Sequence, residues 1–179
     1  MVIIENNLMQ AELLHYFCTQ CWGLKVEAVV SAGREGIAAV AQVKPDVVLA
    51  ALPPSDLGLV SFVNQLRRAA PAAKLILLTA QCNEYFVHIL GSVDYHALVL
   101  VADESLSTLG QVIERVRQGA RFISDRIARS QAALWAAPAS FPKLLSKREE
   151  EVLVCIAHAF SDDEIAQRLG VESHEVVRT

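Results

Sequence analysis

Five short apolar runs follow one another along the first part of the chain, each followed by a segment with apolar residues at helical spacing. The runs that predict β-strands are Val2–Ile4, Lys25–Val30, Asp46–Ala51, Lys74–Leu78 and Ala97–Val101. The segments that predict helices after them are Ala11–Cys21, Gly33–Gln42, Leu59–Ala69, Asn83–Leu90 and Leu106–Gln118. Nearly uninterrupted apolar strands are typical of a parallel sheet that helices cover on both faces. The pattern therefore predicts a doubly wound α/β domain with a five-stranded parallel sheet.

The pattern changes after this domain. The sequence DRIARSQAALWA predicts a helical extension, and the prolines and small residues of APASFP mark a linker. From Lys143 onward the sequence predicts helices without strands. Two capping-box pairs open the first two of these helices, Ser146 with Glu149 and Ser161 with Glu164. We therefore expect a first domain over 1–124, an extension and linker over 125–142, and a small all-α domain over 143–179.

Composition excludes several classes of protein. Apolar residues make up 53% of the 179 residues, which argues against disorder, and charges interrupt the apolar runs too often for a transmembrane span. The N-terminal stretch MVIIENNLMQ lacks the basic segment and cleavage site of a secretory signal, so we expect a cytoplasmic protein without membrane contacts. The net charge of −4 gives no general attraction to nucleic acid, so DNA binding would need a local basic surface.

A CxxC motif, Cys18 with Cys21, lies towards the end of the first predicted helix, and His15 precedes it by one turn. On one helical face these three side chains could bind a metal. However, the sequence offers no fourth ligand nearby, and a redox CxxC normally opens a helix directly after a strand. We therefore interpret the cysteines as small hydrophobic residues, and we expect no metal site and no cofactor.

The C-terminal stretch LLSKREEEVLVCIAHAFSDDEIAQRLGVESHEVVRT closely resembles the LuxR-type helix-turn-helix. The residues that match this family's pattern are Leu145, Ser146, Arg148, Glu149, Glu151, Val152, Leu153, Ser161, Glu164, Ile165, Ala166, Leu169, Gly170, Val171 and Val176. The resemblance implies that Ile165, Ala166 and Leu169 seat a scaffold helix, and that the following helix enters the major groove of DNA. The residues that it assigns to DNA binding are Ser161, Ser173, His174, Val177 and Arg178.

The charge of this stretch differs from that of a DNA-binding unit. From residue 143 onward, five Lys and Arg residues stand against eight Asp and Glu residues, which gives a balance of −3. In the family, much of the basic charge lies in the recognition helix and just after it, and Val177 stands where Lys or Arg is usual. We therefore expect a helix-turn-helix that is incomplete at its C-terminus and that binds DNA weakly or not at all as the chain stands.

With this C-terminal stretch, the first domain is similar to the flavodoxin-like receiver of NarL/FixJ-type response regulators. In such a receiver, acidic residues after the first strand and an aspartate at the end of the third hold Mg²⁺. A hydroxyl after the fourth strand and a lysine after the fifth contact the phosphoryl group. The matching positions here are Glu5 and Asn6, Ala51, Thr79 and Ala102. Because a methyl group can neither attack phosphorus nor bind a metal, the resemblance implies a receiver without a phosphoacceptor.

Nearby residues do not replace the missing groups. Asp56 lies in the loop beyond Pro53 and Pro54, and Asp46 opens the third strand at its opposite end. We interpret Thr79 as a capping residue, since it has no partners for the switch. The first domain is therefore expected to be a pseudo-receiver, in which the fold is kept and the phosphorylation chemistry is lost. Its remaining uses are dimerisation, ligand binding and protein contact.

Two helices offer apolar surfaces on which a homodimer could form. The helix Leu106–Gln118 carries Leu109, Val112, Ile113 and Val116, most of which we expect to cover the sheet. The first helix offers Met9, Leu13, Tyr16 and Phe17 as a second candidate surface.

The sequence as a whole predicts a transcriptional regulator that acts independently of aspartyl phosphorylation and binds DNA as a homodimer. The alternative is a pseudo-receiver that senses a ligand or holds a partner protein, and so modulates another regulator without binding DNA itself. No nucleophile–base pair, complete metal set or phosphate-cradling glycine loop is visible, so we do not expect an enzyme. A small-molecule effector could enter the crevice at the carboxyl ends of the strands, where Glu5, Asn6, Thr79 and Ala102 are expected to converge. Equally, side chains could fill this emptied site.

Overall fold

The computed structural model describes residues 1–54, 56–136, 147–157, 160 and 164–166. The chain divides into two units, residues 1–133 and residues 134–179, and each is described here by itself. The sequence-based division at residues 124 and 142 differs from this one and stays a prediction.

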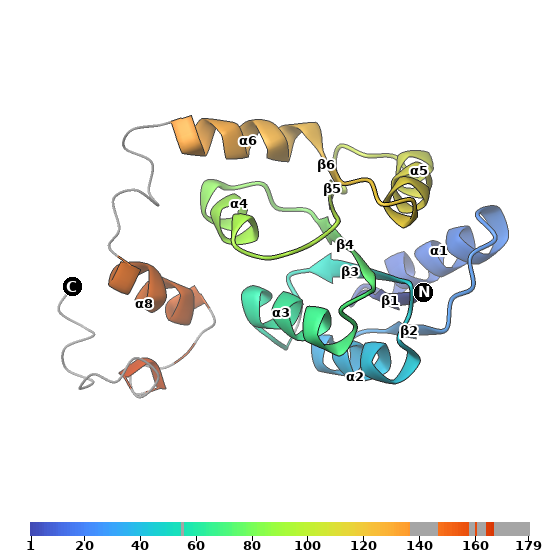
Figure 1. The fold of residues 1–179 in the computed structure, drawn as a ribbon, viewed down its shortest axis with the longest axis horizontal. Coiled ribbons are helices and arrows are strands. Elements are labelled where there is room, and N and C mark those ends of the chain that lie inside the picture. Colours follow the sequence, from blue (N-terminus) through green and yellow to red (C-terminus); the bar gives the residue numbers. More distant parts are fainter. Residues whose placement is uncertain (55, 137–146, 158–159, 161–163, 167–179) are drawn as a thin grey trace. The chain divides into compact units, whose positions relative to one another are not determined.

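A parallel sheet forms the centre of the first unit, with the strand order β2-β1-β3-β4-β5-β6 (Figure 1). The strands are β1 Val2–Ile4, β2 Ala28–Val30, β3 Val47–Leu52, β4 Lys74–Thr79, β5 Ala97–Leu100 and β6 Phe122–Ile123. Each pair of neighbours in this order runs parallel, which confirms the predicted doubly wound sheet. The sequence analysis missed the sixth strand, because two half-buried residues are too few to show a strand pattern.

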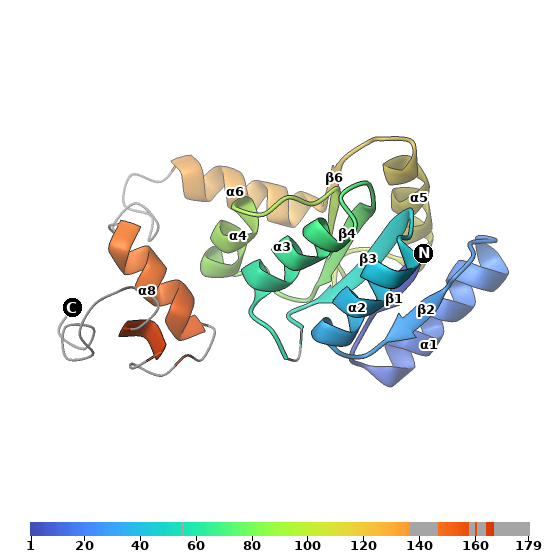
Figure 2. The same cartoon turned by 60° about the horizontal axis from the view of Figure 1, so that its bottom comes forward.

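Helices cover both faces of the sheet, as Figures 1 and 2 show. One face carries α2 Gly33–Val43, α3 Leu59–Ala69 and α4 Glu84–Gly91. The other carries α1 Leu8–Tyr16, its π-helical continuation η1 Phe17–Cys21, and α5 Leu106–Arg117. Consecutive residues of β3 serve opposite cores: Val48 and Ala50 pack towards α3, and Val47 and Leu49 towards α5. The bounds predicted for α3 are those observed.

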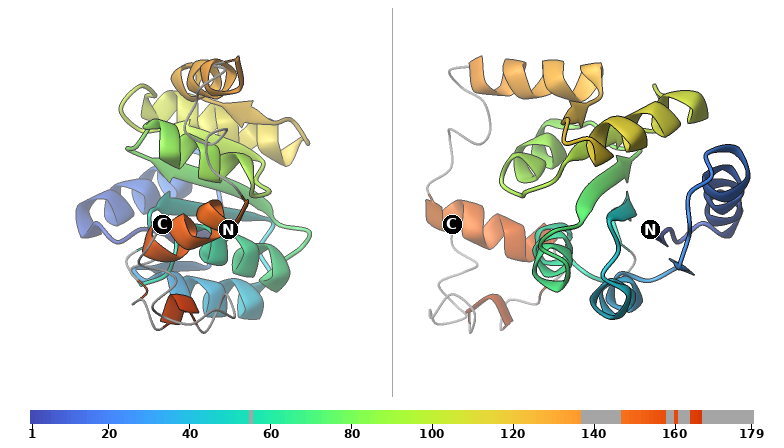
Figure 3. Two further views of the ribbon diagram at one scale, coloured as in Figure 1. Left: turned by 90° about the vertical axis from the view of Figure 1, so that its left-hand side faces the viewer. Right: turned by 45° about the vertical axis from the view of Figure 1, so that its right-hand side comes forward.

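The helix α6 Asp125–Ala136 has the bounds predicted for the helical extension. Its Ile127 is fully buried in the same core as α3 and α4. Ser124, at the start of this helix, is also fully buried, and its hydroxyl accepts a hydrogen bond from Leu100 N at 3.0 Å. The chain therefore passes from β6 into α6 while it is still part of the first unit (Figure 3).

In the second unit, the structure describes the helix α8 Lys147–Ala157 and a few residues after it. Cys155, Ile165 and Ala166 are buried. Burial of Ile165 and Ala166 agrees with the expectation that these two side chains pack inward. The two capping serines Ser146 and Ser161 and the predicted recognition helix lie outside the described residues. No helix within the described ranges of either unit has the length and the apolar character that a membrane crossing needs.

Gly36 allows α2 to lie directly on β1. A β-carbon at this position would overlap the side chain of Ile4 and would lie 2.8 Å from its Cγ1 atom. Ile4 is only 3% exposed and is enclosed by the core, so it has no space into which it can move. By contrast, a β-carbon at Gly91, in the last turn of α4, would meet no atom within 4 Å.

We predict that Gly36→Ala lowers the free energy of unfolding by about 1–3 kcal/mol, because the added methyl group overpacks the contact between α2 and Ile4. Gly91→Ala is the matched control, and it should be neutral or should stabilise by up to about 1 kcal/mol, as alanine does in a helix. Urea denaturation of both variants measures the difference. Equal stabilities of the two variants would contradict the proposed close packing.

Candidate functional site

The carboxyl ends of parallel strands meet at one edge of the sheet, and four of the positions singled out in the sequence lie there. Glu5 directly follows β1, Ala51 lies near the end of β3, Thr79 ends β4, and Ala102 follows β5. The strand register places them side by side, since Ile4 pairs with Ala50 and Leu52 pairs with Thr79. The structure thus places these four positions at one edge of the sheet.

Two of these four positions are alanines, Ala51 and Ala102. Ala51 is half-buried and offers a methyl group at the strand position where a receiver has its nucleophile. Ala102 is exposed and offers another methyl group where a receiver has its lysine. Neither can form a bond to phosphorus or balance the charge of a phosphoryl group.

The hydroxyl of Thr79 forms hydrogen bonds within the turn that follows β4. Thr79 is 1% exposed, and its Oγ1 accepts a hydrogen bond from Gln81 N at 2.9 Å. The same hydroxyl donates to Gln81 O at 3.3 Å. Both bonds are local, so Thr79 closes the loop after β4 and acts as the capping residue that the sequence analysis expected.

The acidic side chain after β1, Glu5, also forms a hydrogen bond within a local turn. Glu5 is 5% exposed, and its Oε1 accepts a hydrogen bond from Asn7 N at 2.8 Å. Asn7 in turn caps α1, because its Oδ1 accepts a bond from Gln10 N at 3.1 Å. Asn6, the second member of the expected acidic pair, is exposed. In the part of the chain that the structure describes, no three His, Cys, Asp or Glu side chains are grouped so that they could hold a metal ion.

Asp56 has a role that the sequence analysis did not find. Its Oδ1 accepts a hydrogen bond from Gly33 N at 2.7 Å, and its Oδ2 accepts one from Arg34 N at 3.1 Å. These are the first two N–H groups of α2, whose own N-cap residue, Ala32, has no side-chain acceptor. Asp56 therefore caps α2 from a loop 23 residues away, and is held away from the strand edge. The missing capping residue before Gly33 was the only sequence signal for this contact.

The CxxC motif does not form one face with His15. Cys18 is fully buried, and this burial raises the pKa of its thiol to about 11. Cys21 and His15 are both exposed. The prediction of hydrophobic packing is right for Cys18 and wrong for Cys21, because the π-helical turn η1 changes the spacing on which the sequence analysis relied.

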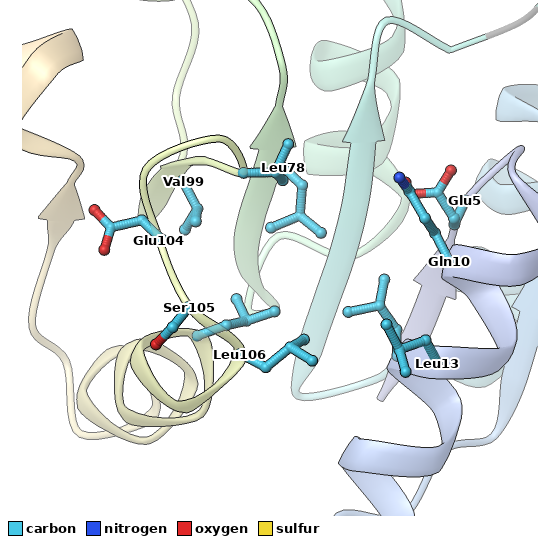
Figure 4. Close-up of a pocket in the computed structure, with 11 residues that line it drawn as sticks. Glu5, Gln10, Leu13, Leu78, Val99, Glu104, Ser105 and Leu106 are labelled. Atoms are coloured by element: carbon cyan, nitrogen blue, oxygen red, sulfur yellow. The ribbon is translucent and has the colours of Figure 1, made fainter.

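A pocket lies between α1 and α5 at the same end of the sheet, with a volume of about 190 Å³ (Figure 4). Its lining residues are Glu5, Gln10, Leu13, Leu14, Leu78, Val99, Val101, Glu104, Ser105, Leu106 and Leu109. Of the residues expected around a crevice, only Glu5 lines it. Asn6, Thr79 and Ala102 do not, so the pocket lies on the α1–α5 side of the sheet and is distinct from the crevice that the sequence analysis expected.

The two candidate dimer surfaces differ in exposure: the one on α5 is buried and the one on α1 is exposed. The apolar stripe of α5 covers the sheet, since Leu109, Val112, Ile113 and Val116 are all at most 5% exposed. On α1, Leu8 is 74% and Met9 78% exposed, and Leu13 and Tyr16 are exposed as well. Phe17 is half-buried and packs edge-on against Tyr16. The unpartnered apolar surface therefore belongs to α1.

The residues assigned to DNA, Ser161, Ser173, His174, Val177 and Arg178, lie outside the described residues.

Comparison with known proteins gives a consistent result, although no family model matches the chain. The response regulator protein VraR of Staphylococcus aureus is 23% identical over 177 residues, which cover 98% of this chain and 81% of VraR. The chain resembles response regulators over nearly its whole length. This confirms the predicted likeness, and it agrees with the expectation that the chain is no enzyme.

Solved structures show the same fold. RcsB of Salmonella enterica serovar Typhimurium, bound to a promoter in the presence of phosphomimetic BeF3−, superposes with a TM-score of 0.70 at 19% identity. That match covers 98% of this chain and 84% of RcsB. The isolated REC domain of the same protein superposes with a TM-score of 0.63 at 16% identity, over 72% of this chain and 95% of that domain. The receiver-like sheet followed by a helical C-terminal region is thus confirmed.

We predict that Asp56→Ala lowers the free energy of unfolding by about 1–2 kcal/mol, because two N–H groups at the start of α2 lose their acceptor. Asp103→Ala is the matched control: among the residues that the structure describes, its carboxylate pairs with Arg126 at 3.2 Å, in an exposed pair that contributes about 1 kcal/mol or less. Chemical denaturation compares the two. A loss for Asp103→Ala as large as that for Asp56→Ala would show that the cap has no special role.

Proposed function

We propose that this protein is a DNA-binding transcriptional regulator of the response-regulator type, and that it acts independently of aspartyl phosphorylation. The observation that carries this proposal is the methyl group of Ala51 at the end of β3, with a second methyl group at Ala102 after β5. Thr79 adds support, because its hydroxyl already closes a turn. A regulator of this kind keeps the receiver fold as a scaffold and uses it without phosphoryl transfer.

DNA is the proposed partner of the second unit. The LuxR-type motif supports this, and so does similarity to RcsB, which has been solved in complex with DNA. The contacts are assigned to Ser161, Ser173, His174, Val177 and Arg178 of a domain over 143–179. Such a protein would work in the cytoplasm, where its DNA is.

Self-association as a homodimer belongs to the same proposal. RcsB has been solved as two dimers bound to two parallel DNAs. In this chain, the surface that supports a dimer is the α1 surface, which we define as Leu8, Met9, Leu13 and Tyr16. Large exposed apolar side chains that are clustered on one helix are typical of a protein interface.

The second candidate function is a pseudo-receiver that modulates another regulator without binding DNA itself. The balance of −3 over residues 143–179 favours it, since phosphate contacts dominate DNA affinity. The two candidates differ in one measurement, the affinity for DNA of a version extended by a complete recognition helix, because both expect weak binding by the chain as it stands.

We predict that a small acyl-phosphate donor with Mg²⁺ adds no phosphoryl mass to the protein and leaves its affinity for a promoter fragment unchanged, because Ala51 has no nucleophilic atom. Intact-mass spectrometry and a fluorescence-anisotropy titration at low salt measure the two effects. Ala51→Asp is the matched reference, since it restores a carboxylate at this position alone. A stoichiometric acid-labile adduct on the unaltered chain would refute the proposal, and absence of DNA binding by a version extended with a complete recognition helix would favour the second candidate.

We also predict that the chain forms a dimer, and that Met9→Gln weakens the dimer by about tenfold, because it places an amide in an apolar interface. Met9 is 78% exposed, so the substitution should not affect folding. Val29→Gln, at a 40% exposed position on β2, is the matched control and should leave the dimer intact. Light scattering over a concentration series measures both. A monomer at all concentrations, or an equal effect of both substitutions, would exclude the α1 surface as the interface.

A further inference from the structure

The pocket between α1 and α5 has an apolar interior. Its floor and walls are formed by Leu13, Leu14, Leu78, Val99, Leu106 and Leu109. The volume of about 190 Å³ slightly exceeds that of an engineered leucine-lined cavity of about 150 Å³ that binds benzene. A single ring with a short chain, or a branched aliphatic group of similar size, therefore matches this space.

A buried carboxylate lies at one side of this interior. Glu5 is 5% exposed, and the single hydrogen bond recorded for its carboxylate comes from Asn7 N. Over residues 1–54 and 56–136, no salt bridge reaches it. Removing a carboxylate from water without a nearby cation is unfavourable, so a cation that enters the pocket would gain a strong interaction there.

The rest of the rim increases this preference for a cation. Glu104 contributes a second carboxylate, and Ala102 contributes no charge. The nearby Arg126 is already engaged with Asp103 at 3.2 Å. Figure 4 shows Glu5 and Gln10 on the α1 side of the pocket, and Glu104 with Ser105 on the α5 side. In Figure 4 the carboxylate of Glu104 is turned outward, so the charge that a ligand meets inside the pocket is that of Glu5, which repels an anion and attracts an ammonium group.

We propose that this pocket binds a small amphipathic amine, with its ammonium group at the Glu5 carboxylate and its apolar body against Leu78, Val99 and Leu106. Gln10 also lines the pocket, and its amide oxygen offers the ammonium group a further acceptor. This site is separate from the proposed DNA binding, since it requires neither the second unit nor phosphoryl chemistry. A failure of one proposal therefore leaves the other intact.

The test is a titration of the full chain with 2-phenylethylamine, 2-phenylethanol and phenylacetate, followed by the amide signals in ¹⁵N–¹H NMR spectra. These probes share one ring and differ in charge. We expect saturable shifts at Leu13, Leu78 and Val99 with the amine, with a Kd on the order of 0.1–1 mM for a ligand of this size. The neutral alcohol should bind about five to ten times more weakly, and the anion should not bind.

Two variants locate the interaction. Glu5→Gln keeps an acceptor for Asn7 N and removes the charge, so it should weaken amine binding by about five- to tenfold and leave the alcohol unaffected. Its matched control is Glu12→Gln, an exposed position of α1 outside the pocket, which should change neither. Leu106→Trp fills the half-buried rim of the pocket and should abolish binding of both probes. If Glu5→Gln does not fold, Leu106→Trp still tests whether the amine binds in this pocket.

Three results would overturn the proposal. One is the absence of a saturable shift at about ten times the expected Kd. Another is equal binding of amine and alcohol, which would leave Glu5 without a role. The third is unchanged amine binding by folded Leu106→Trp, which would place the amine elsewhere on the protein.

Discussion

Burial of the parallel sheet on both faces is the constraint on which the rest of the first unit depends. Successive residues of a central strand such as β3 supply two separate cores, so each must be apolar and closely packed. Only residues at or beyond the strand ends are free of this demand. Ala51 is half-buried at such an end, and it can replace a carboxylate without a cavity or a clash in either core. The fold and the phosphorylation chemistry are therefore separable in this architecture.

The polar side chains at this end of the sheet make structural contacts. Glu5 and Thr79 each bond to the backbone two residues further on, and Asp56 holds the start of α2. A hydrogen bond of this kind contributes about 1 kcal/mol, and breaking it in a buried turn costs more, because the partner is left unsatisfied. These bonds fix the local turns at this edge of the sheet.

Local patterns predicted the elements well, whereas contacts between distant segments were beyond them. The runs of apolar residues located five strands, and the bounds of α3 and α6 were right, because each element has a clear period or a clear end. The strand β6 has only two residues, and the π-helical turn η1 shifts Cys21 out of register. The cap by Asp56 and the pocket between α1 and α5 depend on tertiary packing alone, so no local pattern could contain them.

The position of the pocket matters for a regulator that acts, as we propose, without a phosphoryl switch. Leu13 lines the pocket and is 44% exposed, so it belongs both to the pocket wall and to the α1 surface. A ligand that orders Leu13 would therefore change the surface through which we propose that two chains associate. Linkage makes this effect reciprocal: a ligand that favours the dimer is itself bound more tightly by the dimer. A pocket that shares one side chain with an interface is thus a physical route by which a small molecule can replace phosphorylation as the input.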